Sequence, residues 1–93
     1  MDETEKARLA LAICNFLALH ARERVAFGLP TLAGIVQALS GASDDADEKA
    51  EACVAELERR GLAREWKPFG FLATQERPHS ASTSPDPWAW VEG

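Results

Sequence analysis

The chain lacks any hydrophobic run that approaches the ~20 residues needed to span a bilayer. Its first five residues, MDETE, carry three acids and no base. A secretory signal peptide has the opposite character, because it begins with a basic segment. We therefore expect a cytoplasmic protein that does not bind membranes.

Cysteine and histidine are also scarce, with two of each. Cys14 and Cys53 occupy core-facing positions of expected helices, which suits reduced thiols that pack as small hydrophobic groups. The sequence does not decide whether a disulfide joins them, although two isolated cysteines make no disulfide framework. No cysteine or histidine is spaced from another as in a zinc site. We expect no metal and no cofactor.

Sequence signals of catalysis are missing as well. There is no glycine-rich phosphate-binding loop, and isolated glycines act as helix breakers. His79 falls in a segment of linker composition, and His20 is expected to pack on the first helix. Acids such as Glu48 and Glu51 share a helix face, but a catalytic pair needs a cleft that so small a domain rarely supplies. We expect a protein that binds rather than an enzyme.

The composition is that of one globular domain. The chain has 93 residues, of which 46% are hydrophobic and 27% are charged. The net charge of −5 disfavours non-specific attraction to polyphosphate or anionic lipid. We assign residues 1–77 to the folded domain and residues 78–93 to a linker and tail.

A first helix is predicted from about Glu3 to Glu23. Leu9, Ile13 and Leu17 recur at the spacing of one helix face. Thr4 is the expected N-cap, and the acids around it suit the positive start of a helix.

A second helix follows the break at residues 28–30. Thr31 is its expected start, and Gly41 lies where a helix commonly ends. Gly34 weakens this helix by roughly 1 kcal/mol relative to alanine. Its missing side chain would let a neighbouring helix approach closely.

The third helix, residues 44–60, is acidic at its start. Ser43 or Asp44 is the expected cap, and each acid in the first turn gains at most ~0.3–1 kcal/mol from the helix dipole. Arg59 and Arg60 lie at the negative end, and Gly61 stops the helix. A buried stripe is predicted at Ala46, Ala50, Cys53, Val54 and Leu57. Helix capping and the dipole alone could account for these acids.

Two alternating segments come next. Residues 62–66 and 69–74 are expected to pair as a β-hairpin about the turn at residues 67–70. Trp66 and Phe71 supply bulk that favours strands.

Three helices and a hairpin, with the junction AELERRGLAR at residues 55–64, resemble a winged helix-turn-helix domain. The resemblance covers residues 7–75 and implies an α+β fold with an extended tail. It also implies that residues 31–39 form the supporting helix, residues 44–60 the recognition helix and residues 67–70 the wing tip.

That family usually binds DNA, but the charge pattern opposes DNA at the recognition helix. Residues 44–58 hold seven acids and one base, a net charge of −7 + 1 = −6, and only Lys49 suits a phosphate or a base edge. Residues 59–77 hold five bases and two acids, a net charge of +3. Arg22 and Arg24 would add to this charge if the fold brought them near. A DNA-binding regulator would therefore use the wing side, with candidate contacts at Arg59, Arg60, Arg64 and Lys67.

Protein recognition is the first choice of function. An acidic helix face can dock on a basic surface, and complementary charge raises the association rate and the selectivity. The candidate contacts are Asp45, Asp47, Glu48 and Glu51. Such a module would be an inhibitor or adaptor of a nucleic-acid-processing complex. In size and charge it is similar to small phage-encoded inhibitors, including anti-CRISPR proteins. A further alternative is an oligomeric structural module, such as a homodimer.

The tail adds two aromatic candidates. Residues 78–87 have the composition of a flexible linker, and Trp88 and Trp90 follow. The two tryptophans either fold back onto the body or form a partner-binding or self-association peptide. In an extended tail both would lie on one side, which would suit addition to a sheet edge.

Overall fold

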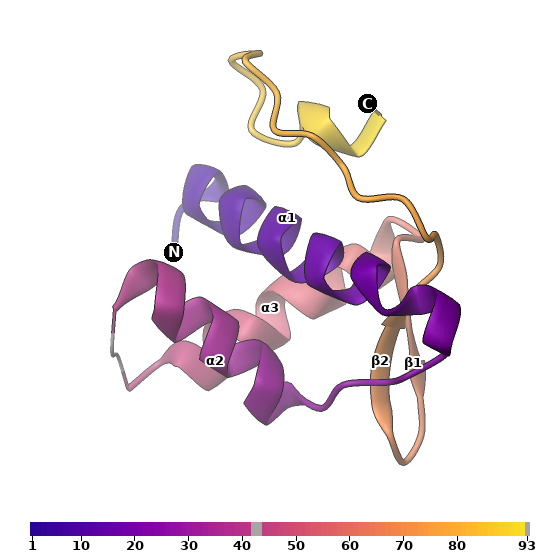
Figure 1. Cartoon of the computed structure of the whole chain (residues 1–93). Helices are drawn as coiled ribbons and strands as arrows, with labels where there is room; N and C mark the ends of the chain where they lie inside the picture. The colour runs from indigo at the N-terminus through magenta and orange to yellow at the C-terminus, as the bar shows by residue number, and fades with distance from the viewer. Residues whose placement is uncertain (42–43, 93) are drawn as a thin grey trace.

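The computed structural model describes residues 1–41 and 44–92 of the chain. Three helices precede a β-hairpin, and a C-terminal tail follows (Figure 1). The elements are α1 (Glu3–Leu19), η1 (Ala21–Glu23), α2 (Leu29–Ser40), α3 (Ala46–Arg59), β1 (Ala63–Trp66), β2 (Gly70–Ala73) and η2 (Ala89–Glu92). The predicted α+β class, with three helices, a hairpin and a tail, is confirmed.

Helix α1 is the central element, because it contacts both other helices and β2. Leu9, Ile13 and Leu17 are buried as their spacing predicts. The side chain of Asp2 caps the helix by accepting a hydrogen bond of 2.7 Å from the amide of Glu5. The prediction of Thr4 as the cap was wrong, since the helix begins at Glu3 and Thr4 lies within the first turn.

Helix α2 begins two residues before the expected Thr31. Pro30 lies in its first turn, where the missing amide hydrogen removes no helix hydrogen bond. Gly41 ends the helix with φ 83°, and its amide donates to the carbonyl of Gln37. Gly34 is exposed, and a Cβ there would meet nothing within 4 Å. The close helix approach expected at Gly34 is therefore absent.

Helix α3 packs on α1 and α2 through the predicted stripe, including Ala50, Cys53 and Leu57. Its N-cap is Asp45, whose side chain makes no capping hydrogen bond. Asp44 precedes it in a turn, so the prediction that Asp44 caps the helix was wrong, and Ser43 lies outside the described residues. The helix dipole still favours acids in this first turn, but side-chain capping does not explain them.

The predicted hairpin forms, but its turn is residues 67–69 rather than 67–70, because Gly70 already belongs to β2. Strands β1 and β2 pair antiparallel, with Ala63 opposite Ala73 and Trp66 opposite Gly70. The amide of Phe69 donates to the carbonyl of Trp66 at 2.8 Å and closes the turn. One face of the hairpin packs on the helices, and the other, which carries Arg64 and Trp66, faces outward.

A third, single-residue strand extends this sheet. Phe27, in the segment between η1 and α2, exchanges two backbone hydrogen bonds of 2.8 Å with Phe71 of β2. The contact needs a glycine at position 70, because a Cβ there would lie 2.3 Å from the carbonyl oxygen of Phe27. The bridge ties the segment between η1 and α2 to the hairpin, and nothing in the sequence pattern predicted it.

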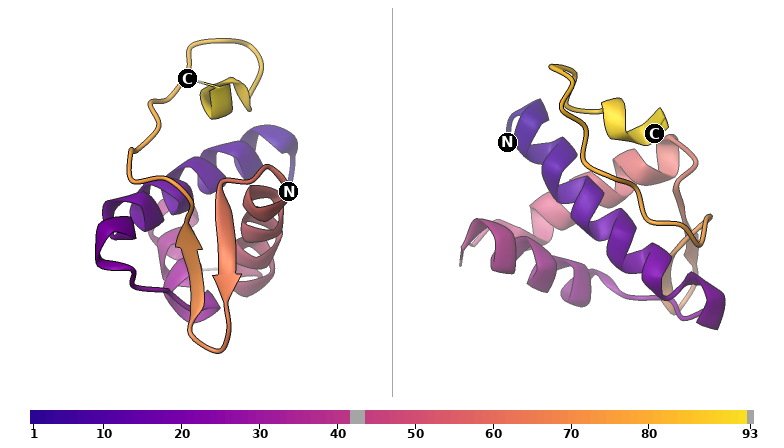
Figure 2. Two further views of the ribbon diagram at one scale, coloured as in Figure 1. Left: turned by 90° about the vertical axis from the view of Figure 1, so that its right-hand side faces the viewer. Right: turned by 45° about the horizontal axis from the view of Figure 1, so that its top comes forward.

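The tail folds back onto the helices. It runs along α1 and turns back into η2 (Figure 2). The backbone amide and carbonyl of His79 bond the side chain of Asn15 at 2.7 and 2.8 Å. Trp88 and Trp90 are 8% and 3% exposed and belong to the same hydrophobic core as α1 and α3. Of the two alternatives for the tail, folding back is the one observed.

Candidate functional site

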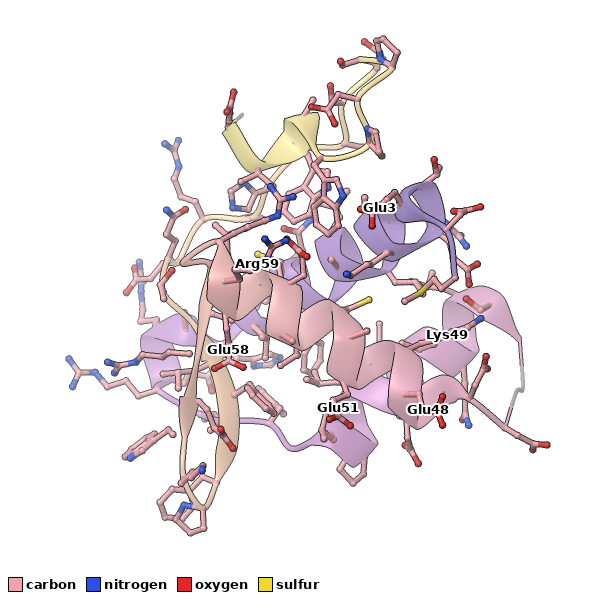
Figure 3. All side chains as sticks on the ribbon, turned by 180° about the vertical axis from the view of Figure 1, so that it is seen from behind. Glu3, Glu48, Lys49, Glu51, Glu58 and Arg59 are labelled. Carbon is pink, nitrogen blue, oxygen red and sulfur yellow. The ribbon has the colours of Figure 1, made fainter. Side chains whose placement is uncertain are left out.

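The exposed side of α3 is a row of carboxylates. Glu48, Glu51 and Glu58 lie along it, and Lys49 lies apart from this row (Figure 3). We call the exposed acids of this helix and its N-cap the acidic face: Asp45, Asp47, Glu48, Glu51 and Glu58. Among the described residues, no cation forms an ion pair with Glu48, Glu51 or Glu58. These three carboxylates are available to a partner.

Lys49, the base within the predicted recognition segment, is engaged in ion pairs within the molecule. Its ammonium donates to the carboxylate of Glu5 on α1 at 2.8 Å and lies 4.0 Å from that of Asp45. The hydrogen bond to Glu5 raises the pKa of Lys49 above its usual value. Lys49 therefore joins α1 to α3 and is not free to meet a phosphate.

Glu56 pairs with three cations near the end of α3. Its side chain is 6% exposed and pairs with Lys6 at 3.3 Å, with Arg60 at 2.8 Å and with Arg59. Hydrogen bonds from Arg59, then from Arg60 and Lys6, lower the pKa of Glu56 to about 2. From the sequence, Glu56 counted only as one of the seven acids of residues 44–58. Its position three residues after Cys53 and three and four before the arginines could have identified it.

Arg60 also holds the tail. Its guanidinium lies 4.2 Å from the centroid of the Trp88 ring, and the Trp88 indole donates to Glu3 of α1 at 2.7 Å. The ring of His79 stacks edge-on against that of Trp90 at 5.3 Å. These contacts bury both indoles against the body, so Trp88 and Trp90 are not exposed to a partner in this structure.

The predicted DNA contacts divide into two groups. Arg59 and Arg60 bond Glu56, and Arg60 faces the tail rather than the wing. Arg64 and Lys67 are exposed on the hairpin, as predicted for the wing side. The four cations do not form one patch. Arg59 and Arg60 are engaged at the end of α3, whereas Arg64 and Lys67 lie on the hairpin.

A groove lies between η1 and the outward side of the hairpin. Its volume is about 580 Å³, and Arg24, Arg64, Trp66 and Leu72 are among its lining residues. Arg24 thus lies beside Arg64, as the sequence analysis allowed. Arg22 is engaged nearby, with its guanidinium 3.8 Å from the carboxylate of Glu76.

Two aromatic rings stand exposed at the hairpin end. Trp66 is 47% exposed and Phe69 is 62% exposed, and their rings meet edge to face at 5.3 Å. From the sequence, Trp66 was expected only as a bulky residue that favours a strand. Its exposure follows from the register, because Trp66 lies on the same outward side of the hairpin as Arg64.

His20 and the two buried cysteines have packing contacts. His20 packs against the rings of Phe16 and Phe27, with centroids at 5.0 and 5.1 Å, and these two rings also contact each other. Cys14 and Cys53 are free and buried, and burial raises the pKa of each thiol to about 11. In residues 1–41 and 44–92, no three histidine, cysteine or acidic side chains gather as metal ligands.

Comparisons with protein-family models, curated proteins and solved structures gave no match, so the geometry of the site carries the functional conclusion. No helix within the described residues is long and apolar enough to cross a membrane.

Proposed function

We propose that this chain is a protein-interaction module whose acidic face docks on a basic surface of a partner. One observation carries the proposal. The carboxylates of Glu48, Glu51 and Glu58 form an unpaired row, while Lys49 and Arg59 of the same helix are held by other groups. Three carboxylates that pair with no cation among the described residues favour association with a surface of the opposite sign.

Helix physics alone does not account for this row. The dipole stabilises acids only in the first turn, and Glu51 lies beyond it. Glu58 is the next-to-last residue of α3, where the negative end of the dipole disfavours a carboxylate. A binding role would give Glu51 and Glu58 a function that the helix dipole does not.

A nucleic-acid-processing protein is the partner class that fits best. Glu48 and Glu58 are separated by ten residues, or ~15 Å along the helix axis at ~1.5 Å per residue. A row of negative groups over this length suits a basic surface that otherwise holds phosphates. By occupying such a surface, the module would act as an inhibitor or adaptor.

Capture from nuclease-treated host lysate tests this function. The wild-type chain is expected to retain a protein that DNA then displaces, since both would use one basic surface. The variant E48K/E51K should lose that protein. The variant E65K/E92K makes the same change in net charge at two other exposed acids and should retain it. Equal loss in both variants would contradict a specific role for α3.

DNA binding through the wing is a second candidate. The exposure of Arg64 and Lys67 favours it, as does Arg24, which lines the same groove as Arg64. If it holds, a fluorescent DNA duplex will bind at physiological salt, and binding will weaken steeply as salt rises. R64E/K67E should then abolish retention. Our first proposal predicts no retention by the wild-type chain under the same conditions.

A further inference from the structure

The outward side of the hairpin has the composition of a protein-binding surface. We define the wing face by four residues: Arg24, Arg64, Trp66 and Phe69. Tryptophan and arginine are the residues most enriched at energetic centres of interfaces. Leu72 lies in the groove beneath them, and the volume of about 580 Å³ falls within the ~300–1,000 Å³ of typical ligand sites.

The end of η1 places Arg24 at the groove. Arg24 is the C-cap of η1 with φ 55°, and its amide donates to the carbonyl of Ala21 at 3.1 Å. This left-handed conformation costs an arginine roughly 1–2 kcal/mol relative to a right-handed one. The side chain lines the groove together with those of Arg64 and Trp66.

The acidic face offers a complementary shape as well as charge. Ala52 and Ala55 line a shallow hollow with Glu48 and Glu51 on the exposed side of α3. The small alanines leave room for a bulky side chain between the carboxylates. The wing face presents the matching groups. Trp66 lines the groove with Arg24 and Arg64, and Phe69 contacts the Trp66 ring. Glu76 also lines the groove, and its carboxylate pairs with Arg22.

We propose that the wing face binds the acidic face of a second copy of this chain. In this contact, Arg24 and Arg64 meet Glu48 and Glu51, and the exposed rings cover the alanine hollow. The inference rests on the proposed function, because it identifies one basic surface that the acidic face can use. The two faces lie on adjacent sides of the molecule, with the hairpin foremost in one view and α3 in the other (Figures 2 and 3).

Reciprocal charge reversal in the full-length chain tests the contact. R24E/R64E gives a wing face that repels the acidic face, and E48K/E51K gives an acidic face that repels the wing face. Each variant alone should stay monomeric in sedimentation velocity at low ionic strength, whereas the wild-type chain should gain mass with concentration. An equimolar mixture of the two variants should regain that association, because each then offers the sign that the other needs.

If net charge alone governed association, the two variants would associate in a different order, so the experiment distinguishes the two explanations. The variant E48K/E51K has a net charge of −5 + 4 = −1, and R24E/R64E has −5 − 4 = −9. If general repulsion governed association, E48K/E51K alone would associate most. Self-association of either single variant at the wild-type level would overturn the proposal, as would a mixture that stays monomeric.

A second variant protects the test against misfolding. R24G removes the guanidinium and relieves the positive φ, so it should fold at least as stably as the wild-type chain. Its self-association should fall by at least tenfold, and unchanged association would overturn the proposal. If the contact fails but lysate capture still depends on Glu48 and Glu51, the proposed function stands and only the second copy as partner is excluded.

Discussion

The guanidinium of Arg60 lies over the indole ring of Trp88, 4.2 Å from its centroid, and joins the end of α3 to the tail. Such a cation–π contact contributes ~0.5–2 kcal/mol, more when it is shielded from water. The same guanidinium bonds Glu56, which also binds Lys6 of α1. One buried carboxylate therefore links α1, α3 and the tail.

Removing a tail tryptophan should destabilise the whole domain. Trp90 belongs to the core, so Trp90→Ala is expected to lower the free energy of unfolding by about 3–5 kcal/mol in urea denaturation. Trp66→Ala is the matched control and should cost less than about 1 kcal/mol, because that ring is half exposed. Equal stability of the Trp90 variant and the wild-type chain would show that the tail packs independently of the body.

Glu56 should make stability depend on pH in the acid range. Its pKa falls from 4.5 to about 2 on folding, so its contribution is present above pH 4.5 and is lost as pH falls toward 2. Glu56→Gln should lower the free energy of unfolding by about 1–3 kcal/mol at pH 7, and the difference should vanish near pH 2. Glu51→Gln, at an exposed and unpaired acid, should change stability by less than about 0.5 kcal/mol. A pH-independent difference between wild type and Glu56→Gln would contradict the ion-pair explanation.

Two glycines should respond oppositely to alanine. Gly70 has φ 128°, and a Cβ there would collide with the backbone of Phe27. Gly70→Ala should therefore cost at least ~1–3 kcal/mol in thermal unfolding. Gly34→Ala should gain about 0.5–1 kcal/mol, because the site is helical, exposed and open. Destabilisation by Gly34→Ala would mean that a neighbour packs on this position.

The two thiols should be unreactive in the folded chain. Burial raises the pKa of both Cys14 and Cys53 to about 11, so little thiolate forms at pH 8. A thiol reagent followed by mass spectrometry should label neither residue in native buffer and both in denaturant. Rapid labelling of either cysteine without denaturant would contradict the packing of α1 against α3.

Most of the fold could be predicted from local pattern. The period of Leu9, Ile13 and Leu17 predicted α1, although the helix ends at Leu19 rather than at the expected Glu23. The alternation in residues 62–66 and 69–74 predicted the hairpin. Helix starts were less certain, because Asp2 and Thr4 are both good caps and only the three-dimensional hydrogen bond distinguishes them. The Phe27–Phe71 bridge was beyond reach, since it joins residues 44 positions apart through backbone groups that any side chain carries.

The candidate site was predictable in charge but not in pairing. The acids at residues 45, 47, 48 and 51 could be placed on one exposed surface from helix geometry. The sequence did not reveal that Lys49 bonds Glu5 or that Lys6 pairs with Glu56, because those pairs depend on how α1 packs on α3. The pairs of Glu56 with Arg59 and Arg60 lie at the end of α3 and follow from helix spacing. The docking of the tail needed the same information, since Glu3 of α1 accepts from the Trp88 indole and Asn15 of α1 bonds the backbone of His79.

The most direct test of the central claim is a titration of the captured partner with three charge variants of the chain. If the chain docks through the acidic face, E48K/E51K should raise the dissociation constant by about 100-fold. This corresponds to a loss of ~2.7 kcal/mol in binding free energy, at ~1.4 kcal/mol per decade. E65K/E92K, with the same net charge, should change it by less than about threefold. R64E/K67E, reversed at the wing, should likewise bind as the wild-type chain does. Equal weakening by E48K/E51K and E65K/E92K, or loss only with R64E/K67E, would contradict docking through α3.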